Sequence, residues 1–127
     1  MPTIRVVRDF MAANPLCAAP WETLASVRRT MLANAFSFLP FSLDHKWSFL
    51  SDYDLARYLS CADRRKAMAC QLDVAVRGKH LSTTNAHCCT EDEHVEKVLK
   101  NAGSQPVLVF DERRERLVGI LTAYDAL

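Results

Sequence analysis

The chain has 127 residues, of which 50% are hydrophobic, and its 16 basic and 15 acidic side chains give a formal net charge of +1. This length suits one compact globular protein with a substantial core. The balanced charge excludes a general attraction to nucleic acid or to an anionic membrane surface. No apolar run is as long as the ~18 residues of a spanning helix. With no signal-peptide pattern at the N-terminus, we expect a cytoplasmic protein.

The first half of the chain has the pattern of one mixed α and β unit. A short strand or turn is expected over residues 6–11, and a helix is expected from Pro20 onward. Aromatic residues and a central proline favour two strands within 36–50, joined by a tight turn at 43–46. Helical spacing returns after Ser51 and continues towards Leu72, which allows a break near Asp63. The apolar face of the first helix is predicted to hold Trp21, Leu24, Val27 and Met31.

The second half repeats this order after a polar stretch. Thr90 and Glu93 have the spacing of a capping box, followed by a helical apolar stripe and the C-terminal signal of Gly103. Apolar runs at 106–110 and 117–121 predict two strands around a charged turn. The predicted domains are a first unit at 1–72, a connector at 73–85 and a second unit at 86–127, whose final helix is cut short after Leu127.

Five cysteines occur in the chain: Cys17, Cys61, Cys70, Cys88 and Cys89. Their odd number and the lack of a C-x-x-C pair argue against a disulfide framework and against a zinc knuckle. Only His87-Cys88-Cys89 invites a metal, and adjacent residues of an extended segment point to opposite faces. We therefore predict no metal and no cofactor, and we interpret the thiols as ordinary buried groups.

Each half contains a Ser/Thr-x-Tyr-Asp tetrad directly after an apolar run. Ser51 and Asp54 recur as Thr122 and Asp125 at one offset of 71 residues (122 − 51 and 125 − 54), which indicates an internal repeat. A hydroxyl at a strand-to-helix turn lies among unpaired N–H groups that attract phosphate, and the Asp offers acceptors to vicinal hydroxyls. The same spacing also predicts a plain helix cap, worth about 0.5–2 kcal/mol without any ligand.

These motifs together resemble a tandem pair of CBS domains, the regulatory module known from cystathionine beta-synthase and also called a Bateman module. The resembling stretches are 7–11 with Asn14-Pro15, 106–111 and 117–125. The resemblance implies an α+β fold of two βαββα units packed sheet to sheet with pseudo-twofold symmetry, associating as a homodimer. It implies a non-catalytic module that senses AMP, ADP, ATP or S-adenosylmethionine and regulates an enzyme or transporter domain.

The resemblance also implies which residues would contact the nucleotide in clefts between the two units. Thr122 and Ser51 would contact phosphate or nearby ribose oxygens, and Asp125 and Asp54 would accept hydrogen bonds from ribose hydroxyls. The base would be enclosed by backbone and side chains at Leu16, Cys17, Phe38, Leu39, Pro40, His87, Cys88, Gln105 and Pro106.

The chain departs from the family pattern in two places. Ser48 stands where the second half has Gly119, so a side chain could enter space left for a ligand. The shortened final helix indicates either a trimmed fragment or a partner that supplies the missing packing. It predicts an exposed sheet face, and burial of that face in a dimer is the preferred explanation. With only three glycines and no nucleophile-base set, an enzyme is disfavoured. The main alternative is a structural or dimerisation module without a small-molecule ligand, and a redox or metal role for Cys88 and Cys89 comes third.

Overall fold

The computed structural model describes residues 4–61 and 63–127. The chain divides into two compact units: unit 1 combines Met1–Pro15 with Ala86–Leu127, and unit 2 is the continuous stretch Leu16–Asn85. No helix among the described residues is both long and apolar enough to cross a membrane.

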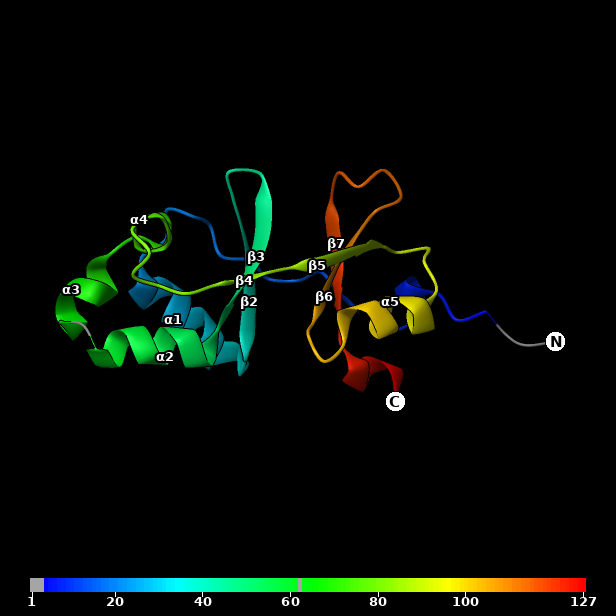
Figure 1. The fold of residues 1–127 in the computed structure, drawn as a ribbon, viewed down its shortest axis with the longest axis horizontal. Helices are drawn as coiled ribbons and strands as arrows, with labels where there is room; N and C mark the ends of the chain where they lie inside the picture. Colours follow the sequence, from blue (N-terminus) through cyan, green and yellow to red (C-terminus); the bar gives the residue numbers. More distant parts are fainter. Residues whose placement is uncertain (1–3, 62) are drawn as a thin grey trace. The chain divides into compact units, whose positions relative to one another are not determined.

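Unit 2 packs four helices on one side of a three-stranded sheet (Figure 1). The strands lie in the order β2-β3-β4, all antiparallel, and Ala18 adds a parallel bridge to Phe41 of β2. The predicted hairpin at 36–50 is confirmed by this pairing. The elements are α1 (Leu24–Asn34), β2 (Phe38–Leu43), β3 (Lys46–Ser51), α2 (Asp52–Cys61), α3 (Arg64–Ala69), α4 (Leu72–Arg77) and β4 (Thr84–Asn85).

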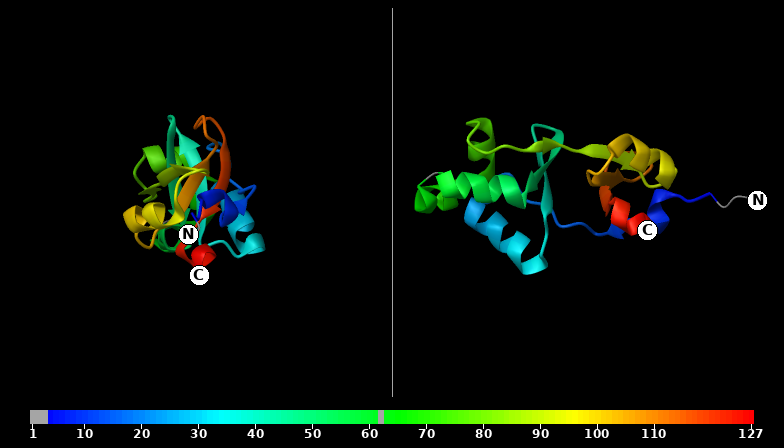
Figure 2. Two further views of the ribbon diagram at one scale, coloured as in Figure 1. Left: turned by 90° about the vertical axis from the view of Figure 1, so that its right-hand side faces the viewer. Right: turned by 60° about the horizontal axis from the view of Figure 1, so that its bottom comes forward.

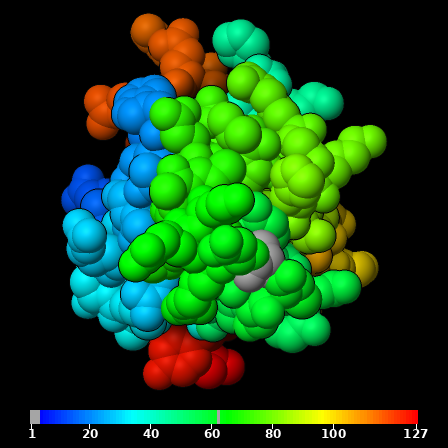
Figure 3. All heavy atoms as spheres, turned by 90° about the vertical axis from the view of Figure 1, so that its left-hand side faces the viewer, coloured from blue at the N-terminus to red at the C-terminus, as the bar shows by residue number. Residues whose placement is uncertain are grey.

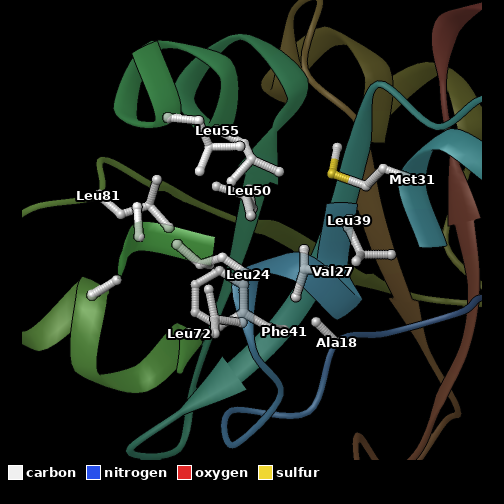
Figure 4. Packing of buried hydrophobic residues seen from close by; sticks show 13 residues of the cluster. Ala18, Leu24, Val27, Met31, Leu39, Phe41, Leu50, Leu55, Leu72 and Leu81 are labelled. Carbon is white, nitrogen blue, oxygen red and sulfur yellow. The ribbon is translucent and has the colours of Figure 1, made fainter. Parts of the chain in front are cut away.

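The core of unit 2 lies between its helices and its sheet (Figure 4). Side chains alternate between the two faces of a strand, so Leu39 and Phe41 both point to the helices. Each buried Leu or Phe contributes about 1.5–3 kcal/mol. The side chains that meet there with no more than 1% exposure are Leu24, Val27, Leu39, Phe41, Leu50, Leu72 and Ala75.

Unit 1 has the same strand order as unit 2. Its sheet is β1-β7-β6-β5, with β5 parallel to β6 and the other pairs antiparallel. The counterparts in unit 2 are β4, β3, β2 and the Ala18 bridge, so the predicted repeat of two α+β units is confirmed. The elements are η1 (Val7–Asp9), β1 (Ala12–Ala13), β5 (His87–Thr90), α5 (Val95–Ala102), β6 (Val107–Phe110), β7 (Leu117–Leu121) and η2 (Ala123–Ala126).

The N-terminal segment belongs to unit 1, so the prediction that residues 1–72 form one unit is wrong at its N-terminal end. Val7 N donates to Glu93 O and Val95 N donates to Arg5 O, both at 2.9 Å. Val7 is fully buried, and β1 pairs with the edge of β7. The backbone groups around Glu93 need partners, and the N-terminal segment supplies them.

In the described part of unit 1, the expected exposed sheet face is also not found. All four residues of β6 are buried, and Val7, Phe10 and Met11 pack into the same core as α5. The turn η2 closes this end of the unit, where Arg5 Nη2 donates to Ala126 O at 3.1 Å. Both views in Figure 2 show η2, in red, next to the blue N-terminal segment. A segment distant in sequence thus covers the face that the short final element leaves open.

The predicted connector at 73–85 is wrong as well, because all of it belongs to unit 2. Helix α4 occupies its beginning and β4 its end, and Leu81 is only 3% exposed. Leu72 N donates to Glu22 O at 2.8 Å and Asp73 N donates to Pro20 O at 2.9 Å. These bonds fix α4 against the segment that precedes α1.

Helix α1 begins at Leu24, four residues later than predicted. Thr23 is its N-cap, and Thr23 Oγ1 accepts from Ser26 N at 3.2 Å. Trp21 precedes the helix and is 71% exposed, so it is not part of the apolar stripe. The break near Asp63 is confirmed, since Asp63 caps α3 by accepting from Lys66 N at 3.4 Å.

Candidate functional site

The tetrad of unit 2 joins the end of β3 to the first turn of α2. Ser51 Oγ donates to Asp54 Oδ2 at 2.9 Å and accepts from Asp54 N at 3.0 Å. A serine hydroxyl has one proton, and here that proton is used within the tetrad. Ser51 can therefore still accept a hydrogen bond, but it cannot donate one to a phosphate without losing Asp54.

The first three N–H groups of α2 are all satisfied by protein groups. Asp52 N donates to Ser37 O at 2.9 Å, and Tyr53 N donates to Asp52 Oδ1 at 2.7 Å. Asp54 N, as described above, is bound to Ser51. The expectation that unpaired N–H groups surround Ser51 is thus wrong, because the helix start is closed by its own caps. An anion at this point would have to displace one of them.

The tetrad of unit 1 has an analogous arrangement at the start of η2. Thr122 Oγ1 donates to Asp125 Oδ2 at 3.0 Å, and Thr122 N donates to the same oxygen at 2.8 Å. The element that follows is a single 3-10 turn rather than an α-helix. The capping interpretation of both tetrads is therefore confirmed.

Each tetrad leaves one carboxylate oxygen available. Oδ2 of Asp54 and of Asp125 is held by the neighbouring hydroxyl, whereas Oδ1 has no hydrogen-bond partner among the described residues. Both side chains are only half-buried. An ionised carboxylate only accepts hydrogen bonds. The chemistry that the tetrads offer to a ligand is therefore recognition of hydroxyl donors.

In unit 2, the residues predicted to enclose the base flank the tetrad on neighbouring strands. Phe38 pairs with Ser51 across β2 and β3, and its ring meets Phe49 edge-on with centroids 6.0 Å apart. Pro40 O accepts from Ala18 N at 2.9 Å, which brings the preceding residues Leu16 and Cys17 to the same sheet edge. Leu16, Cys17 and Phe38 are exposed and Pro40 is buried.

Leu39 does not fit this predicted set through its side chain. That side chain is 1% exposed and lies in the core of unit 2, on the helix side of the sheet. Because neighbouring residues of a strand point to opposite faces, Leu39 faces away from Phe38 and Pro40. Only its backbone is left for a ligand contact.

In unit 1, the predicted residues gather at one end of the sheet. Val107 pairs with both His87 and Leu121, so Pro106, just before β6, and Thr122, just after β7, lie at the same end of the sheet as His87. The cavity beside His87 and Cys88 measures about 70 Å³, room for roughly two waters at ~30 Å³ each. It is too small for a nucleoside. Gln105 is exposed next to Pro106.

The thiols of this region are poorly suited to redox or metal chemistry. Burial raises the pKa of the Cys88 thiol, against a smaller opposing effect of Arg114. Burial, Glu93 and Cys88 together raise the pKa of Cys89 to about 12. Partial desolvation of its thiol raises the pKa of Cys17 as well, although the residue is exposed. The prediction that the cysteines are ordinary buried groups is wrong for Cys17, Cys61 and Cys88, which are exposed, and holds for Cys89. The thiolate is the reactive and metal-binding form. Across residues 4–61 and 63–127 no cluster of three His, Cys, Asp or Glu side chains could hold a metal ion.

Sequence reasoning missed a polar pocket of about 230 Å³ next to Asp54. Its missed members include Arg57, on the same face of α2, and His80 and Ser82 from the supposed connector. The Tyr58 and His80 rings lie 6.5 Å apart. The signal for Arg57 was the i, i+3 spacing from Asp54. His80 had no such signal, because it lies in the polar stretch that was predicted to be a connector. The pocket is lined by Asp54, Arg57, Tyr58, Cys61, His80 and Ser82.

A larger groove of about 520 Å³ lies elsewhere on unit 2, between α1, α2 and α3. Figure 3 shows the helical face of this unit, with α1 in blue to cyan beside the green α2 and α3. The groove is mainly apolar, and Arg28 and Arg64 belong to its lining. None of the residues predicted to contact a nucleotide contributes to it, although Asp52 of the first tetrad and its partner Ser37 belong to the lining.

Gly119 is explained by packing within unit 1 rather than by space for a ligand. A Cβ atom there would lie 2.5 Å from Met11 Sδ, 2.9 Å from Met11 Cγ and 3.0 Å from Ala12 O. Gly119 pairs with Ala13 as Ser48 pairs with Asn85. The absent side chain thus makes room for the N-terminal segment.

No family model matches the chain, and no curated protein sequence is significantly similar to it. Solved structures do match. One is a Vibrio cholerae protein assigned to acetoin utilization, AcuB, with TM-score 0.73, 18% identity and coverage of 98% of this chain and 88% of that one. Another is the CBS domain pair of protein MJ0100 in complex with 5-methylthioadenosine and S-adenosyl-L-methionine, with TM-score 0.69, 22% identity and coverage of 98% and 94%.

A third match is CBSX2 in complex with AMP, with TM-score 0.65, 19% identity and coverage of 95% of this chain and 92% of that one. At these identities the likeness concerns the fold. It agrees with the two similar α+β units and with their common strand order. The chain therefore has the fold of a tandem pair of CBS domains.

Proposed function

We propose that this chain is a non-catalytic regulatory module that binds an adenosine-containing nucleotide at one or both tetrads. The observation that carries the proposal is the free Oδ1 of Asp54 and Asp125, at equivalent points of two similar units. The MJ0100 pair in complex with S-adenosyl-L-methionine and CBSX2 in complex with AMP support this class of ligand.

In this proposal the aspartates recognise ribose and the hydroxyl residues position the aspartates. Oδ1 accepts hydrogen bonds from vicinal ribose hydroxyls, while Ser51 or Thr122 holds Oδ2. A carboxylate that is already fixed loses less conformational freedom on binding. Ser51 and Thr122 thereby take a positioning role in place of the predicted phosphate contact. Preferential binding to one conformation is sufficient to transmit occupancy to a regulated partner.

A ligand panel of AMP, ADP, ATP, S-adenosylmethionine and adenosine tests the proposal. At a hundredfold excess over Kd, a bound ligand should add about 2.7 kcal/mol of stability, which raises Tm by several degrees. Asp54→Asn and Asp125→Asn should weaken binding, and 2′-deoxy-AMP should bind less tightly than AMP. Asp63→Asn is the matched control, since Asp63 is an exposed carboxylate that caps α3 and belongs to neither tetrad. Calorimetry gives each Kd.

The alternative is a structural module in which the tetrads act only as caps. It is favoured because the Ser51 proton and the first three N–H groups of α2 already have protein partners. That reading expects no thermal shift with any compound of the panel. It also expects Asp54→Asn and Asp125→Asn to change only the stability. The homodimer and the cytoplasmic location stay predictions, and sedimentation velocity measures the former.

A further inference from the structure

The pocket beside the first tetrad contains a cation that the tetrad itself lacks. Asp54, Arg57, Tyr58 and Cys61 follow one another along α2 at helical spacing and form one wall. His80 and Ser82, from the segment before β4, form the other. Asp54 thus belongs both to the candidate site, through its hydrogen bond with Ser51, and to the lining of this pocket.

Arg57 is available to an incoming anion. Its side chain is exposed and has no ion pair or hydrogen bond within residues 4–61 and 63–127. Other arginines of the molecule are engaged: Arg77 binds Asp44 at 2.8 Å, and Arg8 lies 3.5 Å from Glu112. A free guanidinium at a concave surface is the donor that suits phosphate best, because its planar fork can form two parallel hydrogen bonds.

The rest of the first tetrad leaves phosphate without a donor. The proton of Ser51 is held by Asp54, and the first three N–H groups of α2 have protein partners. A phosphate attached to a ribose on Asp54 must therefore find its donors farther along α2. Arg57 is the cation one helical turn away on the same wall.

The dimensions of the pocket fit this division of roles. Its volume of about 230 Å³ is below the ~300–1,000 Å³ of sites that enclose a whole drug-sized ligand. It suffices for a ribose phosphate, with an acceptor at Asp54 and donors at Arg57 and Ser82, while the base lies outside. S-adenosylmethionine, whose sulfonium is positive, would meet the Arg57 charge unfavourably.

We propose that Arg57 makes the first tetrad selective for phosphorylated nucleosides, such as nucleoside monophosphates, over unphosphorylated adenosine compounds. This inference rests on the proposed function, since it requires a nucleoside on Asp54. Asp54 supplies recognition of the ribose, and Arg57 supplies recognition of the phosphate.

Calorimetric titration of the full chain with AMP and with adenosine tests the selectivity. Arg57→Gln should weaken AMP binding about tenfold or more, the effect of losing a charge-assisted hydrogen bond. Adenosine affinity should stay within about twofold, and Arg57→Lys should restore part of the loss because it keeps the charge. The control is Arg65→Gln, an exposed arginine of α3 that lines neither pocket. Repeating the titrations in an Asp125→Asn background isolates the first tetrad.

The outcomes separate the two proposals. AMP binding that is tighter than adenosine binding in the wild type, and equal to it in Arg57→Gln, supports the role of Arg57. AMP binding that Arg57→Gln leaves unchanged, or a variant that loses AMP and adenosine equally, overturns this inference while the regulatory function stands. If no adenosine compound binds the wild type, both are overturned. Matching thermal unfolding curves of Arg57→Gln and Arg65→Gln show that both variants are folded.

Discussion

In each of the two tetrads, the two carboxylate oxygens of the aspartate have different roles. Oδ2 of Asp54 and Asp125 stabilises the protein by fixing a neighbouring hydroxyl, and Oδ1 remains available to a ligand. A cap and a binding site are therefore compatible in one side chain. The sequence predicted these residue types and their spacing, but the direction of each hydrogen bond depends on backbone geometry that no motif encodes.

Cys89 should make the stability of the protein sensitive to alkaline pH. Folding raises its pKa from 9.0 to about 12, chiefly through burial. The neutral thiol is therefore favoured in the folded state. Its contribution is complete below pH 9 and is lost as the pH rises towards 12, because only the unfolded thiol ionises there. Urea denaturation between pH 8 and 11 measures this loss.

Cys89→Ala tests the assignment through the slope of stability against pH. The variant is less stable near neutral pH because it leaves a cavity, but its stability should fall less steeply above pH 9. Cys61→Ala, at an exposed thiol of α2, should keep the wild-type slope. Equal slopes for Cys89→Ala and the wild type would contradict the prediction.

Among the elements, the short strands β1 and β4 have equivalent places in the two units. Each is two residues long and pairs antiparallel with the last strand of its sheet, β7 or β3. At β1 the approach is close enough that only glycine fits opposite, at Gly119, whereas β4 accepts Ser48. The difference between the two halves is therefore a packing difference.

Gly119→Ala should reduce stability by about 1–3 kcal/mol, the usual cost of overpacking. The added methyl group would overlap the Met11 side chain and make a tight contact with Ala12 O, so Met11 would have to move and β1 would have to give slightly. Ser48→Ala, at the equivalent point of unit 2, should cost less than about 1 kcal/mol. Guanidinium denaturation gives both values. If Met11→Ala recovered none of the loss in the double variant, the proposed contact would be wrong.

An element can be predicted from the sequence when its hydrogen-bond and packing partners lie nearby along the chain. The hairpin of β2 and β3, the helix α5 and the strands β6 and β7 were all predicted, because each has a periodic pattern and local turn signals. Helix α4 was missed because its hydrogen bonds go to Pro20 and Glu22, far along the chain. The start of α1 was misplaced because Pro20 imitates a first helical residue.

In the whole molecule, the two structural units do not coincide with the two halves of the sequence. The prediction divided the chain at its polar stretch, but Val7 lies in the core with Val95 and Val107. Nothing local to residues 5–11 indicates this partnership, because the matching donors and acceptors lie at 91–95. The sequence does not give which oxygen of each aspartate is free or that Arg57 lines a pocket; both follow from the folded chain.

Val7→Ala should destabilise unit 1 by about 1–3 kcal/mol, since Val7 is fully buried there. Hydrogen exchange measured by mass spectrometry should accelerate in residues 86–127 and change little in residues 16–85. Ala67→Gly, at a buried position of α3, is the reciprocal control and should act on unit 2. Faster exchange in 16–85 of Val7→Ala would restore the division at residue 72.

Because unit 1 contains both Met1–Pro15 and Ala86–Leu127, it can be completed on the ribosome only after unit 2 has been synthesised. Unit 2 is continuous, so all of its residues have been made before unit 1 receives any of β5, α5 or the strands that follow. Unit 1 can close only by joining two segments across the whole of Leu16–Asn85, at the entropic cost of a long loop. A folded unit 2 shortens that loop. We therefore expect unit 2 to fold first and to bring together the two sequence segments that form unit 1.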